Sequence, residues 1–215
     1  MYDYTPKSWS FSALHTYEEC ALRYVLEKLS TEPRKTSWAL EEGLRIHSLM
    51  EHYLLGNIQG VPRELDKFSK QLKKFKADGA EAEGEICLDK NWQPVKSKDP
   101  WKSSDTWIRA KLDATNGNKI VDLKTGRQYK YYLGQADLYA TLTFQITDTP
   151  TLSFEFWYSK TGVVDAYKFS RKDQGERMEK WNTRAMKLMN EKHWLPKLND
   201  GCKWCNFTDK CELMK

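Results

Sequence analysis

Three cysteines near the carboxyl end constrain the fold of this chain more than any other feature. Cys202, Cys205 and Cys211 have the spacing C-x2-C-x5-C in the stretch GCKWCNFTDKCELMK. Thiols this close together are typical of a site that binds a metal ion or a metal cluster. The other two cysteines, Cys20 and Cys87, lie far upstream, so a further sulfur ligand requires the tail to fold back on an earlier segment.

The composition predicts a single folded domain. A chain of 215 residues can bury a core and is at the upper end of what one domain usually holds. Hydrophobic residues make up 40% and charged residues 30%, which excludes a disordered chain, and no apolar run approaches the roughly 20 residues that span a bilayer. The start, MYDYTPKSWSFS, has no basic segment followed by an apolar one, so we expect no secretory signal, a cytoplasmic location and no disulfides.

The charge distribution is compatible with a nucleic-acid partner. The net charge is +5, and nine Trp and eleven Tyr are interleaved with 35 Lys and Arg. Such a surface suits binding of phosphates and stacking of bases. The alternative is a solvated basic surface around an aromatic core, because net charge informs on partners and not on fold.

Apolar spacing divides the chain into a helical part, a sheet and a helical tail. Helical periodicity predicts helices over residues 10–29, 38–56 and 64–79, with Cys20 on the first. Residues 1–80 are therefore expected to be mainly helical. Alternation predicts strands over 84–90, 106–115, 119–125, 151–159 and 163–170, with a helix over 129–146 and a last helix opening at Ser170. We expect an α/β domain with a mixed central sheet over 81–170 flanked by helices, and a helix with the Cys-rich tail over 171–215.

The stretch KLDATNGNKIVDLKTG carries the candidate chemistry. Its Asn-Gly-Asn predicts a β-hairpin. Side chains alternate along a strand. One face of the second strand is thus expected to carry Ile120, Asp122 and Lys124, while Val121 and Leu123 point into the core.

A second carboxylate, Asp113, ends the partner strand. We expect it on the face shared with Arg109 and Lys111, so that it converges with Asp122 across the hairpin. Two carboxylates and an ammonium suit a hard divalent cation, which activates water and stabilises charge on a phosphate under attack. The alternative is a half-exposed hairpin with ordinary salt bridges.

Two pairs of residues at helical spacing strengthen the first interpretation. Gln135 and Tyr139 are four residues apart, and the short connection before them can bring their helix face over the strand. Gly43 and His47 have the same spacing, and the glycine permits close approach beside an imidazole. His15 and His52 are interpreted as structural histidines.

These elements resemble the PD-(D/E)XK nuclease superfamily, and within it the RecB-like exonuclease branch. The resemblance rests on Gly43-x3-His47, Asp113, Asp122-x-Lys124 and Gln135-x3-Tyr139. It implies a restriction-endonuclease-like core. Leu112 stands where the superfamily's name has proline, the second acid is Asp where many relatives have Glu, and the short spacing between the acids leaves no room for an insertion that reads DNA sequence.

The branch includes an iron–sulfur subset, with AddB-type nuclease domains and the nucleases of CRISPR adaptation. In that subset one cysteine precedes the nuclease core and three follow it. Here the resemblance implies a 4Fe–4S cluster on Cys20, Cys202, Cys205 and Cys211, joining the two ends of the chain. Four thiolates also suit tetrahedral Zn2+, which is the alternative. Cys87 is interpreted as a buried, inert thiol.

Carried over to this chain, the resemblance assigns the metal site. Asp113, Asp122 and His47 would bind Mg2+ or Mn2+, with Leu123 counted at the same site. Lys124 would orient or deprotonate the attacking water.

Other residues would support the site or the substrate. Gln135 and Tyr139 would support the ligands and contact the DNA backbone. Glu83 and Glu85 are candidate accessory carboxylates, with a solvated strand start as the alternative. Separately, the aromatics Trp204 and Phe207 either stack bases near the cluster or pack in the core.

The implied function is a metal-dependent DNA exonuclease that acts on free ends or single strands in recombination, repair or phage DNA metabolism, in a bacterial or phage-infected cell. No Walker A sequence is present, so unwinding would come from a helicase or recombinase partner. The alternative is a non-catalytic nucleic-acid-binding module with a structural metal cluster.

Overall fold

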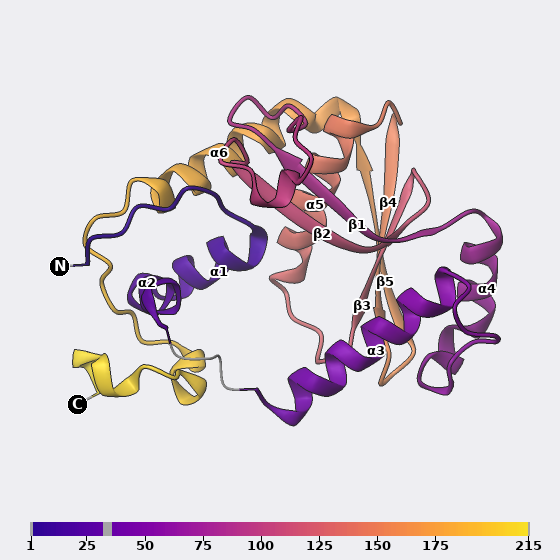
Figure 1. Cartoon of the computed structure of the whole chain (residues 1–215), viewed down its shortest axis with the longest axis horizontal. Helices are drawn as coiled ribbons and strands as arrows, with labels where there is room; N and C mark the ends of the chain where they lie inside the picture. Colours follow the sequence, from indigo (N-terminus) through magenta and orange to yellow (C-terminus); the bar gives the residue numbers. More distant parts are fainter. Residues whose placement is uncertain (1, 32–35, 215) are drawn as a thin grey trace.

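The computed structural model describes residues 2–31 and 36–214 and contains a five-stranded mixed sheet flanked by helices (Figure 1). The strands follow one another across the sheet in chain order. They are β1 (Glu81–Leu88), β2 (Ile108–Thr115), β3 (Lys119–Lys124), β4 (Thr151–Tyr158) and β5 (Val163–Ser170). Neighbouring strands are antiparallel except β3 and β4, which are parallel. A parallel pair requires a crossover, and α5 (Tyr132–Ile146) supplies it, so the predicted mixed sheet is confirmed.

The helices agree with the predicted positions, with two corrections. They are α1 (Phe11–Glu19), α2 (Ala21–Leu29), α3 (Trp38–Leu54), α4 (Ser69–Ala77), α5 (Tyr132–Ile146) and α6 (Gln174–Met189). The single helix predicted over 10–29 is wrong. The backbone is extended at Cys20, which ends α1 and begins α2, and its Sγ accepts a hydrogen bond from the N–H of Arg23.

The other correction concerns helix starts. The predicted helix over 64–79 begins as a 3-10 segment, Arg63–Phe68, before α4. Likewise Ser170 caps a 3-10 turn, Arg171–Asp173, and α6 begins only after it.

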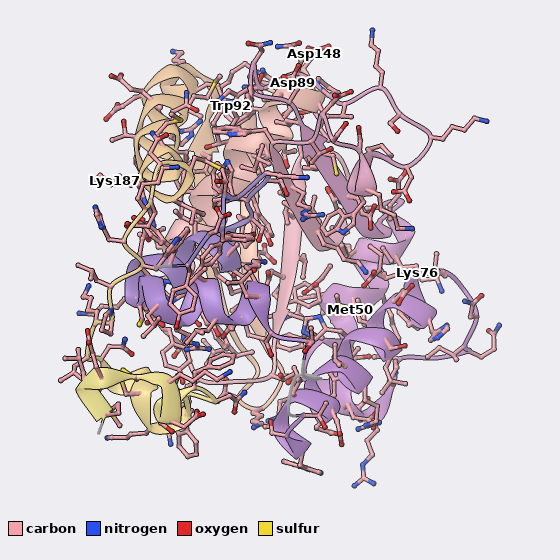
Figure 2. The ribbon with its side chains drawn as sticks, turned by 60° about the vertical axis from the view of Figure 1, so that its left-hand side comes forward. Met50, Lys76, Asp89, Trp92, Asp148 and Lys187 are labelled. Carbon is pink, nitrogen blue, oxygen red and sulfur yellow. The ribbon has the colours of Figure 1, made fainter. Side chains whose placement is uncertain are left out.

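The sheet is covered on both faces. One apolar cluster packs α1, α2, α5 and α6 against the sheet, and a second packs α3, α4 and the 3-10 segment before it against the sheet. Figure 2 shows Met50 of α3 and Lys76 of α4 on one side of the molecule and Lys187 of α6 on the other.

Strand β3 has the expected alternation of side chains and is buried on both faces. Ile120 belongs to the cluster under α5, while Val121 and Leu123 belong to the cluster under α3. As predicted, Asp122 lies on the same face as Ile120, and both are buried, with Asp122 only 5% exposed. The reason is topological, because β3 is the central strand and helices cover both of its faces.

The two ends of the chain pack side by side (Figure 1). The backbone N–H of Leu22 donates to the carbonyl of Leu195, and the amide of Asn199 donates to the carbonyl of Glu19 at 3.0 Å. The tail therefore folds back on the α1–α2 junction, as the cysteine spacing required. Within the described residues, every helix is too short or too polar to cross a lipid bilayer.

Candidate active site

The candidate site lies where β2 and β3 separate. The hairpin turns at Gly117, whose φ of 88° suits glycine, and the two strands pair only at Ala114 with Val121 and at Thr115 with Ile120. Beyond this point the two backbones no longer pair, and the Asp113 carboxylate replaces a backbone carbonyl as the hydrogen-bond acceptor for β3. Its Oδ2 accepts a hydrogen bond of 2.8 Å from the backbone N–H of Leu123. The fork between the strands thus holds Asp113 in a fixed position.

Helix α3 brings His47 to the same carboxylate. His47 Nδ1 lies 3.2 Å from Asp113 Oδ2. One turn earlier, a Cβ on Gly43 would lie 3.1 Å from Thr125 Oγ1, just after β3. The predicted close approach at Gly43 is therefore present, and it sets the distance between α3 and the end of β3.

On the other side of the fork, α5 supports Asp122 and Lys124. Gln135 Nε2 donates to Asp122 Oδ2 at 2.8 Å, and Gln135 Oε1 accepts from Lys124 Nζ at 2.9 Å. Lys124 Nζ lies 2.6 Å from Asp122 Oδ1. This oxygen is buried and has an ion-pair contact without the geometry of a hydrogen bond to any described residue. The three side chains form a closed polar triangle.

Burial dominates the electrostatics of the site. Loss of hydration raises the pKa of Asp122 to about 6, and the charge of Asp113 adds to this, while Lys124 and His47 act in the opposite direction. Burial lowers the pKa of His47, but the hydrogen bond and charge of Asp113 outweigh it and leave that pKa raised. Burial, and then the charge of Asp122, raises the pKa of Tyr139. The two carboxylates therefore repel each other unless a cation lies between them.

The donor set fits a hard divalent cation in its chemistry. It offers two carboxylates and an imidazole, and one buried carboxylate oxygen without a hydrogen-bond donor. In the described part of the chain, no three His, Cys, Asp or Glu side chains are close enough together to hold an ion as they stand. The carboxylates are instead occupied by His47 and Lys124.

Some residues that we expected at or beside the site have other partners. Arg109 shares a face of β2 with Asp113, as alternation predicted, but its guanidinium donates to Ser8 Oγ and to the carbonyl of Trp101. Lys111 pairs with Glu83, which adopts a φ of 57° opposite Asp113. Leu123 contributes its backbone N–H, while its side chain is fully buried and cannot hold a metal ion.

The remaining expected residues lie near the site without direct contact with the carboxylates. Glu85 pairs in register with Lys111. Tyr139 is half-buried, packs against the cluster under α5 and contacts Phe154 edge-on.

Two further histidines, interpreted from the sequence as structural, contact neighbouring side chains. His15 pairs with Glu19 on its own helix, and His52 contacts the Asn57 amide.

Two contacts were missed from the sequence. Tyr132 lies with its ring centroid 4.3 Å from Lys124 Nζ, and Thr125 faces Gly43. Neither residue is marked by a spacing. Tyr132 is one of three tyrosines in the stretch YKYY, which offered the only available signal.

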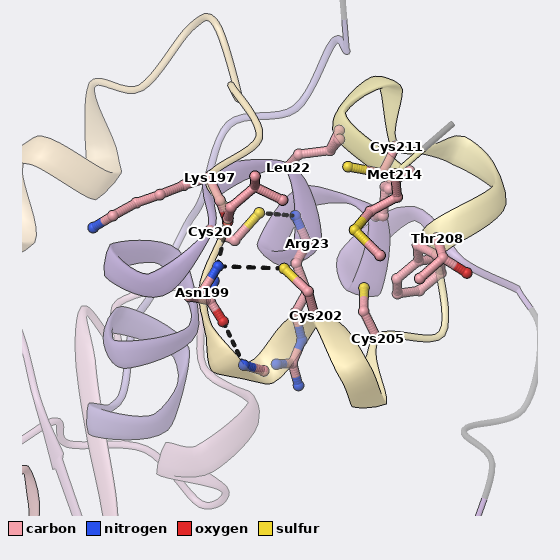
Figure 3. A pocket seen from close by; sticks show the side chains of 14 residues that line it. Cys20, Leu22, Arg23, Lys197, Asn199, Cys202, Cys205, Thr208, Cys211 and Met214 are labelled. Carbon is pink, nitrogen blue, oxygen red and sulfur yellow. Dashed lines mark hydrogen bonds between the residues drawn. The ribbon is translucent and has the colours of Figure 1, made fainter.

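The four cysteines at the chain ends line one pocket (Figure 3). Cys20 from the α1–α2 junction faces Cys202, Cys205 and Cys211, with Leu22, Leu26, Phe207 and Met214 around them. Cys20 and Cys202 Sγ each accept a backbone N–H, from Arg23 and Asn199. Their sulfurs do not form a close metal-binding group among the described residues.

Three further side chains that the sequence singled out differ in their burial. Cys87 is buried in β1, and burial raises its pKa. Trp204 is 83% exposed, whereas Phe207 is partly buried against the core. Core packing therefore accounts for Phe207 but not for Trp204.

Comparison with known proteins identifies a family over nearly the whole chain. The sequence profile of the PD-(D/E)XK nuclease superfamily matches residues 8–212. The crystal structure of SSO0001 superposes with a TM-score of 0.50 at 13% identity, covering 100% of this chain and 90% of that chain. At this identity the likeness concerns the fold alone. No curated protein matches the chain.

Proposed function

Because this chain belongs to the PD-(D/E)XK nuclease superfamily, we propose that it is a DNA exonuclease dependent on Mg2+ or Mn2+, acting on free ends or single strands. The observation that carries the proposal is the fork of β2 and β3. There Asp113 and Asp122 approach the imidazole of His47 and the ammonium of Lys124 in a buried setting. Ordinary surface salt bridges would not bury Asp122 to 5% exposure.

In this proposal Asp113, Asp122 and His47 hold the metal ion. When bound, the ion activates water and stabilises negative charge on the phosphate. The Leu123 N–H keeps Asp113 oriented at the fork.

Lys124 and Gln135 act around these ligands. Lys124 orients the attacking water and stabilises the charge that develops on the phosphate oxygens. Gln135 holds Asp122 and Lys124 in one arrangement. Tyr139, one turn further along α5, supports Gln135 and lies on the side proposed for the DNA backbone.

Two features support action at ends or single strands over sequence-specific cleavage. The β2–β3 connection is a short turn, between Thr115 and Lys119, and has no insertion that could read base edges. The resemblance to RecB-like nucleases supports a role in recombination, repair or phage DNA metabolism, with unwinding by a helicase or recombinase partner.

We further propose that the cysteine pocket holds a 4Fe–4S cluster. Four thiols from the two ends of the chain line it, and two of them accept backbone N–H groups. Such hydrogen bonds to sulfur are typical of iron–sulfur sites. Anaerobic purification should give a brown protein with about four iron atoms per chain, whereas a colourless protein with one zinc ion would replace the cluster by the zinc alternative.

The nuclease proposal is tested with end-labelled single-stranded DNA, end-labelled duplex and a closed circle, with Mg2+ or Mn2+ and with chelator. We expect metal-dependent digestion of the linear substrates, survival of the circle, and loss of digestion with retained DNA binding in Asp122→Ala. A non-catalytic binding module would bind DNA and show no activity in the parent chain. Digestion of the circle would replace exonuclease by endonuclease.

A further inference from the structure

Three aromatic rings, those of His15, Tyr131 and Tyr129, form a row beside the candidate active site, and a fourth, Phe11, packs against the first two. Phe11 and His15 of α1 stack with centroids 6.0 Å apart and planes within 10°. His15 stacks on Tyr131 at 4.2 Å and 25°, and Tyr131 on Tyr129 at 5.5 Å and 22°. Phe11 also stacks against Tyr131, at 6.4 Å and 21°. The row therefore runs from His15 on α1 to Tyr129 in the connection between β3 and α5, and buried Phe11 flanks its inner end.

The outer end of this row is open to solvent. Tyr129 is 49% exposed and Tyr131 is 40% exposed. Within the described residues, the only ring that stacks near-parallel on Tyr129 is that of Tyr131. An exposed ring at the end of a stacked row is a surface on which another flat ring can add, because every nucleobase has a π-face for such stacking.

The row is joined to the proposed catalytic groups through a single ring. Tyr132 lies edge-on to Tyr129 at 5.7 Å and to Tyr131 at 4.6 Å. The same ring lies under Lys124 Nζ at 4.3 Å, and Lys124 pairs with Asp122. A molecule stacked on Tyr129 would therefore lie close to the place where a phosphate is proposed to be cleaved.

The charge and anchoring of the connection indicate what stacks there. Arg127 and Lys130 flank Tyr129, both are exposed, and neither forms an ion pair with a described residue. Gln128 is tied to β5, since its amide donates to both oxygens of Asp165 at 3.0 and 3.2 Å. The connection is therefore held against β5 by Gln128 and carries exposed aromatic and basic side chains. Such a surface suits a ligand that is flat and negatively charged.

We propose that Tyr129, backed by Tyr131, stacks an unpaired base of the DNA strand that enters the site. Bases within a duplex are already stacked on one another and offer no free face, so a single strand or a frayed end is the form that this surface accepts. The inference rests on the proposed nuclease function in one respect, namely that the bound strand leads into the active site. The stacking itself is a binding event that does not require hydrolysis.

The test measures binding of the full chain in chelator, so that no cleavage occurs. Fluorescence anisotropy compares labelled oligothymidylate with an oligonucleotide of the same length whose residues are abasic. The variants are Tyr129→Ala, Tyr129→Phe and Tyr129→Leu. Leu133→Ala is the matched control, because Leu133 is equally exposed at 49% and lies at the start of α5. Circular dichroism verifies that each variant is folded.

The expected result is specific to the ring and to the base. Tyr129→Ala should weaken binding of oligothymidylate about tenfold, which corresponds to about 1.4 kcal/mol. Tyr129→Phe should retain binding, Tyr129→Leu should lose most of it, and Leu133→Ala should be unchanged. On abasic DNA all five proteins should bind alike, since only phosphate contacts remain.

Three results would overturn the inference. They are parent-like binding by Tyr129→Ala, an equal loss on abasic DNA, or failure of the parent chain to bind oligothymidylate at all. The nuclease proposal fails separately. A chain that shows the base-dependent loss but never cleaves DNA keeps the stacking surface without the enzyme, whereas a chain that digests DNA regardless of Tyr129 keeps the enzyme without the stacking surface.

Discussion

Gln135 on α5 donates a hydrogen bond of 2.8 Å to Asp122 on β3, and its other amide atom accepts one from Lys124. One uncharged side chain thus orients both a proposed metal ligand and the proposed phosphate-binding ammonium. A residue that orients ligands affects metal binding without touching the metal. Its removal typically lowers metal affinity or activity by about 10- to 100-fold.

Gln135→Ala should therefore raise the Mg2+ concentration needed for half-maximal digestion, by about tenfold or more. The KM for DNA should change little, because Gln135 is proposed to act through Asp122 and Lys124. Titration of Mg2+ against the rate on end-labelled single strands measures the effect. Gln145→Ala is the matched control, since Gln145 lies on the same helix and bonds Met178 instead. An unchanged metal requirement in Gln135→Ala would remove this role.

Asp122→Asn should stabilise the metal-free protein at neutral and alkaline pH. The pKa of Asp122 is raised to about 6 from the 3.8 of an unperturbed aspartate, mainly by burial. Because the folded value is the higher one, the protonated carboxyl contributes its full stability below about pH 4, and this contribution is lost as the pH rises through about 6. Asparagine stays neutral at every pH and avoids that loss.

Thermal unfolding in chelator between pH 4 and pH 8 measures this difference. The Tm of Asp122→Asn should exceed that of the parent by a few degrees above about pH 6, and the two should converge near pH 4. Asp105→Asn serves as the control, because Asp105 is exposed. A variant less stable than the parent at pH 8 would mean that the pair with Lys124 outweighs the cost of burying the charge.

Gly43→Ala should reduce activity although alanine favours helices. In open space this change stabilises a helix by about 1 kcal/mol. At Gly43 the new Cβ would lie 3.1 Å from Thr125 Oγ1, tighter than an ordinary contact, and we expect α3 and His47 to shift by a few tenths of an ångström from the end of β3. Digestion rates should fall about tenfold, an order-of-magnitude estimate for a displacement of a positioned group.

The double variant Gly43→Ala, Thr125→Ala separates the clash from other causes. Removing Oγ1 makes room for the Cβ, and the double variant should regain most of the rate lost by Gly43→Ala. Gly175→Ala on α6 is the control, because a Cβ there meets no atom within 4 Å. Equal digestion rates for Gly43→Ala and the parent would show that the contact between α3 and the end of β3 tolerates a Cβ at this position.

The sequence correctly predicted those elements whose signals lie within a few neighbouring residues. Strand β5 covers Val163–Ser170, as alternation indicated, and the β2–β3 hairpin follows from Asn-Gly. The break at Cys20 could not be predicted in this way, because the apolar stripe continues through it. The contact beside this break is distant in the sequence, because the backbone N–H of Leu22, at the start of α2, donates to the carbonyl of Leu195.

The candidate site was predictable only in part, for a related reason. Helical spacing correctly paired Gly43 with His47, but the contact of His47 with Asp113 depends on how α3 crosses the sheet. Strand alternation correctly put Asp122 with Lys124 and Asp113 with Arg109, but it could not show that Ser8 and Trp101 hold the Arg109 guanidinium. Periodicity gives the face of a strand, whereas the order of strands decides what covers that face.

The last prediction concerns how the two ends of the chain are joined. Cys20→Ser should abolish the brown colour and iron content of anaerobically purified protein and lower its stability. A cluster on Cys20 and the tail cysteines would close a loop of about 180 residues in the unfolded chain. Its loss should therefore lower the free energy of unfolding by about 3 to 5 kcal/mol. Limited proteolysis should then cleave the tail after α6 before it cleaves the sheet.

Cys87→Ser is the matched control, because Cys87 lies in β1 and does not line the pocket. It should retain iron, colour and resistance of the tail to proteolysis, although burying a hydroxyl lowers stability modestly. If Cys20→Ser retains parent iron content, then Cys20 is not a ligand. In that case the hydrogen bonds of Asn199, Leu22 and Lys197, with the stacking of Trp194 on Tyr24, would hold the tail against the α1–α2 junction without a cluster.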